Sequence, residues 1–344
     1  MRTVAIISST VYPASFENYG SEWTNAVLAR ELARLGYRVY LHAPARSMRP
    51  EGVVLRPIPC TCGRIDEEME HIVAQVYMDE LEGADFIIDA SSAAAVAEEM
   101  FFYRKFNGVY VRNGIDASYP RLPVSQHVHG VLTSRTAVDE AVRRTSWLRR
   151  ELLHVMPLPV PSDVFTPGEE ERDIDFLYVG AARADKATSL LSMVPQLRGK
   201  RVAIAVGVTA DDHRAFAPRL RELAESTQGV EVIYVENSPY ARKLELYRRA
   251  KFMVTVPVRE YVEAFGLTTV EAMMAGATPV RESWGGSAEI VEDGVSGYLV
   301  GSPEEAVRTV LERPPLDPAA LRRYAMERFD APVVAARWAE LIGR

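Results

Sequence analysis

The chain has 344 residues, 48% of them hydrophobic and 25% charged, and its 40 basic and 47 acidic side chains leave a formal net charge of −7. A single hydrophobic core rarely grows beyond about 250–300 residues, so we expect two globular domains. This average composition excludes collagen, a coiled-coil rod and wholesale disorder, and without a global basic field a nucleic acid is not expected as the principal partner.

Nothing in the sequence has the pattern of a targeting or membrane-spanning segment. Residues 1–12 lack the long apolar run of a signal peptide, and no stretch reaches the ~20 apolar residues of a spanning helix. Cys60 and Cys62 are the two cysteines, and a disulfide between residues so close in sequence would be strained. We therefore expect a cytoplasmic protein that is soluble or at most peripheral on a membrane.

The first 160 residues alternate between strand and helix patterns. A strand over residues 3–9 and a loop to residue 20 precede a helix over residues 22–35, whose apolar residues recur at helical spacing until Gly36. Further strands are predicted at residues 38–43, 53–58, 86–89, 109–112 and 127–133, and further helices at residues 66–81 and 93–106. Strand–helix–strand units with short connections build parallel sheets, so residues 1–160 predict an α/β domain.

Four prolines between residues 157 and 167 mark a linker, after which the alternation restarts. The second set of strands is predicted at residues 176–179, 202–206, 231–234 and 252–256, with helices near residues 185–197, 212–226 and 240–249. This pattern predicts a second α/β domain over residues 161–325. Residues 318–344 are predicted to form two helices that are punctuated by Asp330 and Pro332. The second of them, expected near residues 331–343, belongs to the C-terminal segment at residues 326–344.

The segment that follows the last of these strands carries the strongest chemical signal. It reads VPVREYVEAFGLTTVEAMMAGATPVRESWGGSAEIVEDGVSGYLV over residues 256–300. Ligands of open parallel sheets gather beyond the carboxyl ends of the strands, where free amides at a helix start can bind phosphate. Glu263 lies in the turn, Gly266 allows close approach of the backbone, and Glu271 lies in the predicted helix. Two carboxylates that accept hydrogen bonds from paired hydroxyls, beside an anion-binding helix start, predict a nucleotide-sugar site.

Both glutamates also have an ordinary structural interpretation. Thr268, Thr269, Val270 and Glu271 fit a capping box, in which Glu271 would bond the first amide of its own helix. Glu263, taken alone, fits a solvated loop carboxylate. The sequence leaves these alternatives open.

The segment EAFGLTTVE, from Glu263 to Glu271, resembles the E-x7-E region of retaining glycosyltransferases with the GT-B fold, the glycogen-synthase-like group called glycosyltransferase family four. The resemblance is good over residues 155–312 and looser before them. It implies two Rossmann-like α/β/α domains that face each other across a cleft. Residues 1–160 would bind the acceptor, residues 161–325 would bind the donor, and the helix at residues 326–344 would cross back to the first domain.

The resemblance also implies an activity. A hexose would move from a UDP-, GDP- or ADP-linked sugar to a hydroxyl of a sugar, glycan or lipid-linked acceptor, with retention of anomeric configuration and without a metal or other cofactor. Glu263 would bind the donor sugar, Glu271 the ribose, and Lys186 the diphosphate. The remaining donor-side groups would be the backbone at Gly20, Gly180, Gly266, Leu267 and Thr268.

Some positions depart from the family's pattern. Ala181 stands where the family has an arginine that binds the diphosphate, and Arg183 is the expected substitute, acting with Lys186 and Glu263 in catalysis. In the first domain Tyr19 and Gly20 stand for the usual glycine pair, and Arg112 and Asn113 replace the usual histidine. Tyr19, Arg112 and Asn113 are the expected acceptor-side residues.

Three further patterns have weaker implications. Asp173 and Asp175 spell the DxD of metal-dependent transferases, although their place after the linker favours solvated carboxylates. His127 and His129 share one face of a strand but have no third ligand nearby. Residues 141–153, with four arginines among apolar residues, are typical of a membrane-surface helix or of an ordinary surface helix.

Two other functions remain compatible with the sequence. A nucleotide-sugar epimerase of similar architecture would use the same donor site without an acceptor. A non-catalytic sugar-binding protein with two α/β lobes would need neither the paired glutamates nor the diphosphate site.

Overall fold

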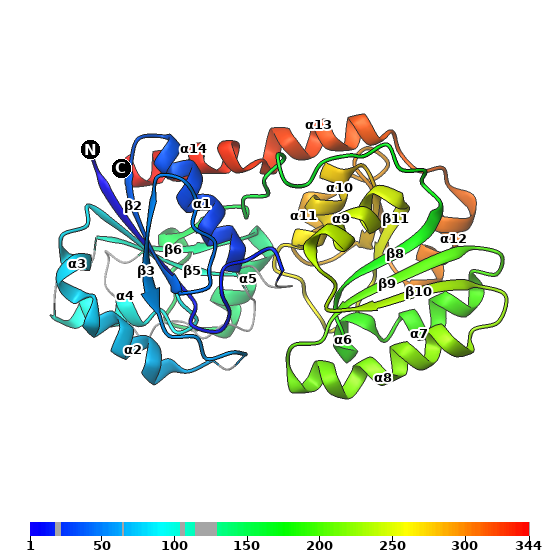
Figure 1. Cartoon of the computed structure of the whole chain (residues 1–344), viewed down its shortest axis with the longest axis horizontal. Coiled ribbons are helices and arrows are strands. Elements are labelled where there is room, and N and C mark those ends of the chain that lie inside the picture. Colours follow the sequence, from blue (N-terminus) through cyan, green and yellow to red (C-terminus); the bar gives the residue numbers. More distant parts are fainter. Residues whose placement is uncertain (18–21, 64, 104–106, 114–128, 344) are drawn as a thin grey trace. The chain divides into compact units, whose positions relative to one another are not determined.

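The computed structural model describes residues 1–17, 22–63, 65–103, 107–113 and 129–343. The chain divides into two compact units (Figure 1). Unit 1 comprises Met1–Pro159 and Ala331–Arg344, and unit 2 comprises Val160–Asp330. The sequence placed the first division at residue 160 and the start of the C-terminal segment at residue 326. The chain re-enters unit 1 at Ala331, which is where the last helix was expected to begin.

Unit 1 is built on one parallel sheet with the strand order β3-β2-β1-β4-β5-β6-β7. Its strands are β1 (Thr3–Ser8), β2 (Arg38–Pro44), β3 (Val53–Ile58), β4 (Phe86–Ala90), β5 (Gly108–Arg112), β6 (His129–Leu132) and β7 (Leu153–Val155). Its helices are α1 (Glu22–Arg34), α2 (Glu67–Val76), α3 (Met78–Glu82), α4 (Ala95–Tyr103), α5 (Arg135–Arg144) and α14 (Ala331–Gly343), with a 3-10 turn at Arg150–Leu152.

The C-terminal helix α14 belongs to the core of unit 1. It lies beside α1 (Figure 1) and contributes four side chains to the apolar layer on one face of the sheet, Val334, Ala335, Trp338 and Ile342. All four are buried. A smaller apolar cluster on the other face joins β1 and β4 to α2, α3 and α4. Residues from both ends of the sequence therefore stabilise one core.

Unit 2 has a six-stranded parallel sheet with the order β10-β9-β8-β11-β12-β13. Its strands are β8 (Ile174–Ala181), β9 (Arg201–Gly207), β10 (Glu231–Glu236), β11 (Ala250–Thr255), β12 (Thr278–Glu282) and β13 (Tyr298–Val300). Its helices are α6 (Ala184–Ala187), α7 (Leu190–Met193), α8 (Asp211–Ser226), α9 (Tyr240–Arg249), α10 (Leu267–Ala275), α11 (Ser287–Ile290), α12 (Pro303–Glu312) and α13 (Pro318–Phe329), with a 3-10 turn at Val194–Gln196.

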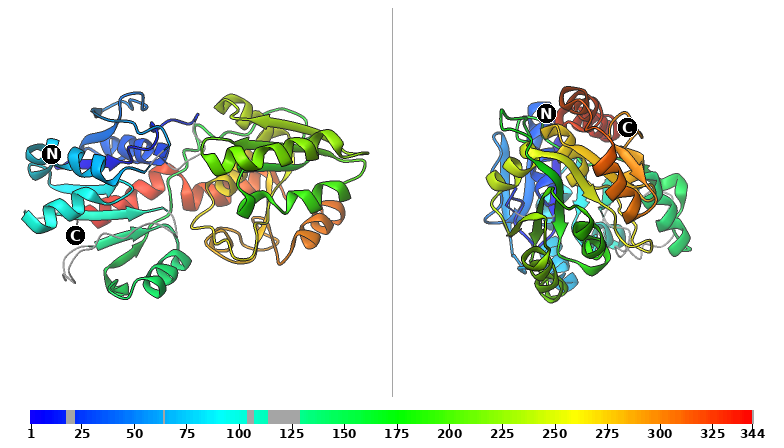
Figure 2. Two further views of the ribbon diagram at one scale, coloured as in Figure 1. Left: turned by 90° about the horizontal axis from the view of Figure 1, so that it is seen from below. Right: turned by 90° about the vertical axis from the view of Figure 1, so that its right-hand side faces the viewer.

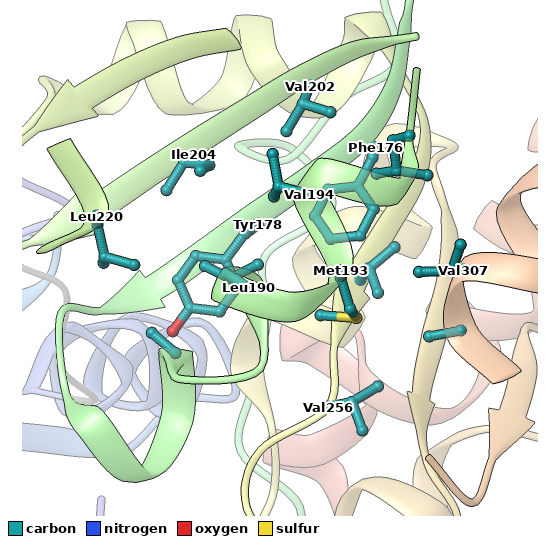
Figure 3. Packing of buried hydrophobic residues seen from close by; sticks show 14 of the residues in the cluster. Phe176, Tyr178, Leu190, Met193, Val194, Val202, Ile204, Leu220, Val256 and Val307 are labelled. Carbon is teal, nitrogen blue, oxygen red and sulfur yellow. The ribbon is translucent and has the colours of Figure 1, made fainter. Parts of the chain in front are cut away.

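Helices cover both faces of the unit 2 sheet, with α7, α8 and α12 on one face and α9, α10 and α13 on the other (Figures 1 and 2). Figure 3 shows the first layer, in which Phe176 and Tyr178 of β8 meet Leu190, Met193 and Val194. All five side chains are essentially inaccessible to solvent. Because β8 and β11 are interior strands, the loops at their carboxyl ends rest on a rigid base.

Three predicted helices are wrong in their continuity. The helix predicted at residues 66–81 breaks at Tyr77, whose backbone leaves the helical region and whose hydroxyl donates to the carbonyl of Pro57. The helix predicted at residues 185–197 is divided into three short turns, the last of which contains Pro195. The first break is a case in which a tertiary contact overrides helical periodicity, and the second coincides with a proline.

The segment over residues 141–153 is likewise not one helix. Residues up to Arg144 complete α5, Thr145 is extended, and Leu153 begins the edge strand β7, which pairs with β6. This arrangement contradicts both predictions of a continuous amphipathic surface helix. The sequence also missed β7 itself and the strands β12 and β13.

Candidate functional site

The predicted donor residues of unit 2 gather at the carboxyl ends of β8, β11 and β12. The turn after β8 meets the turn after β11 where the amide of Val258 donates to the carbonyl of Asp185, at 2.9 Å. The turn after β12 holds the same segment from the other side. There the indole of Trp284 donates to the carbonyl of Tyr261 at 3.0 Å, and the amide of Gly286 donates to the carbonyl of Glu263 at 2.6 Å.

Close contact explains the glycine at position 286. A Cβ added to Gly286 would lie 2.0 Å from the carbonyl oxygen of Ala264, which is backbone and cannot yield. The turns after β11 and β12 therefore fit together only because position 286 has no side chain. This contact fixes the backbone on which Glu263 stands.

Lys186 and Glu263 form the centre of the site. The Lys186 Nζ lies 2.9 Å from the Glu263 Oε2, and their side chains are 22% and 19% exposed. Tyr261 lies against both: its hydroxyl is 3.4 Å from the Glu263 Oε2, and its ring centroid is 5.0 Å from the Lys186 Nζ. The structure thus brings together a lysine and a glutamate that are 77 residues apart in the sequence.

Electrostatics keep this pair charged. Burial would raise the pKa of the Glu263 carboxyl, but the charges of Lys186 and then Arg281 outweigh burial and lower that pKa. Burial would lower the pKa of the Lys186 ammonium, but the charge of Glu263 raises it. Burial, followed by the charge of Glu263, raises the pKa of Tyr261 to about 12, so this hydroxyl remains protonated. A bound anion would therefore compete with Glu263 for a permanently charged lysine.

Arg183 lies at the edge of the site. Its Nη2 is 2.5 Å from the Asp185 Oδ2, its Nε is 3.7 Å from the Asp212 Oδ2, and its guanidinium lies 5.7 Å from the centre of the Tyr261 ring. Two carboxylates thus face this arginine. Ala181 is the last residue of β8, and a Cβ on Gly180 beside it would approach the Tyr178 hydroxyl at 2.8 Å.

Helix α10 begins without a side-chain cap. Its N-cap is Gly266, at φ +92°, and Leu267 and Thr268 form its first turn. This geometry contradicts the predicted capping box, because no side chain of α10 accepts a hydrogen bond at the cap. The first amides of a helix have no partner within the helix, so this turn can bind an anion.

Glu271 has partners of its own within unit 2. The residue is 2% exposed. Its carboxylate accepts a hydrogen bond from the Tyr247 hydroxyl at 2.7 Å and lies 3.6 Å from the Lys243 Nζ. Both partners come from α9, and neither is the first amide of its own helix. The structure therefore places Glu271 in a buried charged contact, with different partners from those of Glu263.

The acceptor-side residues of unit 1 are described in part. Arg112 ends β5, is buried, and donates from its Nη1 to the carbonyls of Ser91 and Val111 at 2.8 and 2.9 Å. Asn113 lines a pocket at the carboxyl ends of β5 and β6, together with Thr24, Asn25, Thr133 and Trp338 among others. Tyr19 and Gly20 lie outside the described residues.

The weaker motifs have structural partners. Asp173 forms an ion pair with Arg249 at 2.7 Å and another with Arg201. Asp175 forms an ion pair with Lys251 at 2.8 Å. Both are thus ion-paired carboxylates rather than solvated linker residues, Asp173 directly before β8 and Asp175 within it. Within the described residues no cluster of three or more metal-ligating side chains occurs.

Among the candidate metal ligands, His129 and the two cysteines each contact a second side chain of the same kind. His129 stacks on His154 with 2.8 Å between the Nδ1 and Nε2 atoms, and His127 lies outside the described residues. Cys60 and Cys62 are both free and exposed, with their Sγ atoms 3.3 Å apart.

Sequence reasoning missed several residues that form the site. Tyr261, Trp284 and Ser287 contact or support the turn of Glu263, and Arg281 acts electrostatically on its carboxylate. Arg281 gave no usable signal, because the strand β12 that carries it was itself not predicted. The roles of Tyr261 and Trp284 depend on how three separate turns meet, which no local pattern records.

Comparison with known proteins assigns these features to a known architecture. Residues 161–328, nearly all of unit 2, match the family model of glycosyl transferases group 1. A D-inositol 3-phosphate glycosyltransferase of Nocardiopsis dassonvillei is 30% identical over 209 residues, which cover 55% of this chain and 48% of that protein. The chain thus spans about half the length of the curated relatives it matches.

Solved structures resemble the whole chain. Sucrose-phosphate synthase of Thermosynechococcus elongatus has a TM-score of 0.78 at 15% identity and covers 99% of this chain and 98% of its own. Anabaena HepE in complex with UDP and glucose has a TM-score of 0.74 at 13% identity and covers 100% of both chains. These likenesses show the two-domain α/β GT-B fold that the sequence predicted. In the described part of the chain, every helix is too short or too polar to cross a lipid bilayer.

Proposed function

We propose that this protein is a glycosyltransferase that moves a hexose from a nucleotide-diphosphate sugar to an acceptor hydroxyl. The contact of Lys186 with Glu263, beside the uncapped start of α10, is the observation that carries the proposal. The match of residues 161–328 to glycosyl transferases group 1 supports it independently. A charged lysine, helix-start amides and a carboxylate at one strand end can bind a diphosphate and a sugar hydroxyl side by side.

The donor would use the residues of unit 2 as follows. Its diphosphate would bind Lys186 and the backbone at Gly266, Leu267 and Thr268, and Gly180 would let the β8 turn approach the phosphates. Its sugar hydroxyls would donate to Glu263, which releases Lys186 when the phosphates arrive. Its ribose would bind Glu271, whose carboxylate Tyr247 and Lys243 already orient.

Departure of the diphosphate would be the step that these residues accelerate. Negative charge grows on the leaving phosphate as the glycosidic bond breaks, and a fixed ammonium and fixed amide dipoles stabilise that charge without reorganisation. Arg183 would add a further cation at the edge of the site. We propose retention of configuration with attack from the same face, the leaving phosphate oxygen accepting the proton of the acceptor hydroxyl. No divalent metal takes part in this scheme, which activity in the presence of EDTA tests.

Two names among the similar proteins suggest substrates to test first. HepE was solved with UDP and with UDP-glucose, so uridine nucleotides head the donor panel, before GDP and ADP sugars. The curated relatives act on D-inositol 3-phosphate, which makes a phosphorylated polyol the first acceptor to try among sugars, glycans and lipid-linked acceptors. We assign acceptor binding to unit 1, with Tyr19, Arg112 and Asn113 as candidate contacts, and we keep Gly20 as a candidate donor-side contact.

A product assay tests the function. Each donor is incubated with and without the acceptor panel, and the products are separated by mass and by anomeric configuration. The proposal predicts a glycosylated acceptor with the donor's configuration, and loss of at least about 100-fold in rate for Lys186→Ala. Lys200→Ala is the matched control, since Lys200 precedes β9 at the opposite end of the sheet and should retain activity.

The two rival functions predict other results of the same assay. An epimerase would convert the donor without any acceptor. A sugar-binding protein would bind free sugar and leave every donor intact. Either result, or full activity of Lys186→Ala, would contradict the proposal.

A further inference from the structure

A buried arginine lies directly behind the proposed phosphate site. Arg281 is near the end of β12 and is 1% exposed. Its Nη2 donates to the Ser287 Oγ at 2.7 Å and to the Glu282 Oε1 at 3.1 Å, while its Nε has no hydrogen-bond partner among the described residues. Burial of a guanidinium with an unsatisfied donor is costly, so its retention calls for an explanation.

The arginine reaches the glycine at which α10 begins. A Cβ added to Gly266 would lie 3.7 Å from the Arg281 Nη2 and 3.0 Å from the Ser287 Oγ. The buried Thr269 Oγ1, 3.2 Å from the same point, also has no partner among the described residues. The guanidinium therefore lies close to the backbone turn of Gly266, on the side to which a Cβ at this position would point.

The two cations nearest the site, Lys186 and Arg183, already face carboxylates, so a further cation would add to the charge available to a phosphate. Lys186 is paired with Glu263, and Arg183 faces the carboxylates of Asp185 and Asp212. The charge of Arg281 already reaches Glu263, whose pKa it helps to lower. Burial raises the pKa of the neighbouring Glu282, which cancels part of the charge of Arg281 when it is ionised.

We propose that Arg281 is a positioning residue that supplies a second positive charge to the donor diphosphate, across the turn at Gly266. The inference rests on the proposed function and deepens it. The guanidinium would hold the Gly266 turn through Ser287 and would add its field to that of the α10 amides. Glu282 would tune this field, because the carboxylate cancels part of the charge of Arg281.

Binding measurements distinguish an electrostatic effect of Arg281 on the diphosphate from a purely structural role of this residue. The probes are UDP, GDP and ADP and their nucleosides, titrated calorimetrically at pH 8.5 to favour the ionised form of Glu282. Arg281→Met should weaken the best diphosphate at least about tenfold and its nucleoside less than about threefold. Arg281→Lys keeps the charge and should retain most of the preference for the diphosphate over the nucleoside.

The variant Glu282→Gln gives a prediction of opposite sign. Its side chain has nearly the same shape but no charge, so the field of Arg281 is no longer offset. Diphosphate binding should tighten about threefold or more, with nucleoside binding unchanged. If Arg281→Met does not fold, as near-ultraviolet circular dichroism would show, this variant decides the question alone.

Three results would overturn the proposal. Equal losses of nucleoside and diphosphate binding in Arg281→Met would show that the residue only holds the fold. Weaker or unchanged diphosphate binding in Glu282→Gln would show that the ligand does not feel this charge. Failure of the wild type to bind any of the three diphosphates would overturn the proposed function as well, which distinguishes the two failures.

Discussion

At the scale of single residues, charge compensation determines which groups are available to a ligand. Lys186 and Glu263 are partly exposed and hold each other in a charged state. Glu271 is the opposite case, because its buried carboxylate is bound by Tyr247 and faces Lys243. The two glutamates of one sequence motif thus have different energetic roles. Glu263 can exchange its partner for a ligand, whereas Glu271, the proposed ribose contact, keeps its partners and also stabilises the fold around the site.

This difference predicts the effect of Glu271→Gln. Loss of the carboxylate charge removes the counter-charge that faces buried Lys243, so unit 2 should lose about 3 kcal/mol of stability in denaturant unfolding. Replacement of both residues, as Glu271→Gln with Lys243→Met, should restore much of the loss. A single variant as stable as the wild type would show that the 3.6 Å contact contributes little.

A histidine in the core of unit 1 predicts a pH dependence. Burial lowers the pKa of His42 from 6.5 to about 4, although Glu80 lies 3.2 Å from its Nε2. Between these values the unfolded chain binds a proton that the folded chain does not. Stability is therefore complete above pH 6.5 and falls as the pH drops toward 4, by about 3 kcal/mol for this one group.

The variant His42→Phe isolates that contribution. It keeps an aromatic ring against Tyr77, whose ring centroid is 4.7 Å away, and cannot titrate. The free energy of unfolding, measured from pH 4 to pH 7, should depend less steeply on pH in the variant. Parallel pH profiles would contradict the role assigned to His42.

At the scale of elements, the short turns after β8, β11 and β12 define the site more than the helices do. Gly266 combines φ +92° with a crowded setting, since its added Cβ would meet the Ser287 Oγ at 3.0 Å and the Thr269 Oγ1 at 3.2 Å. Gly294 has a similar φ of +74° with no heavy atom within 4 Å of the added Cβ. Substitution of Gly294 would therefore test backbone strain alone, whereas substitution of Gly266 would add steric contact.

Matched alanine variants use this contrast. Gly266→Ala and Gly294→Ala should each lose about 1–2 kcal/mol of stability, because both place an L side chain in the left-handed region. Only Gly266→Ala should also lose nucleoside diphosphate binding, since its Cβ displaces the start of α10. Equal binding by the two variants would argue against a phosphate site at this turn.

Long periodic elements could be predicted from the sequence, whereas broken ones could not. The helix predicted at residues 240–249 coincides with α9. The helix predicted at residues 212–226 corresponds to α8, which begins one residue earlier, at Asp211. Helical periodicity failed at residues 185–197 because the segment divides into α6, α7 and a 3-10 turn that contains Pro195. The motif located Glu263 and Lys186 separately, but their contact depends on the pairing of β8 with β11.

At the scale of the whole molecule, the chain leaves unit 1 at residue 160 and returns to it at residue 331. The apolar side of α14 is part of the unit 1 core, with Trp338 3% exposed and Val334 inaccessible. Burial of a large apolar side chain contributes about 1.5–3 kcal/mol, so Val334, Trp338 and Ile342 together amount to much of the stability of a domain, and Ala335 adds less. Unit 1 thus depends on the last residues of the chain, although its sheet is complete without them.

Truncation after Asp330 tests this dependence. The shortened chain should expose unit 1 to rapid proteolysis, while unit 2 remains protected and binds nucleotide. Arg337→Ala, on the exposed side of α14, is the control and should leave protease resistance unchanged. Persistence of a protected unit 1 in the truncated chain would contradict the role of α14.

The central claim is that a donor diphosphate binds unit 2 between Lys186 and the first turn of α10. A crystal structure with the nucleotide sugar that binds best tests it most directly. We expect phosphate oxygens within hydrogen-bond distance of the Lys186 Nζ and of the amides at Gly266 to Thr268, with the Glu263 carboxylate turned from the lysine to the sugar. Nucleotide bound elsewhere, with the contact of Lys186 and Glu263 intact, would contradict it.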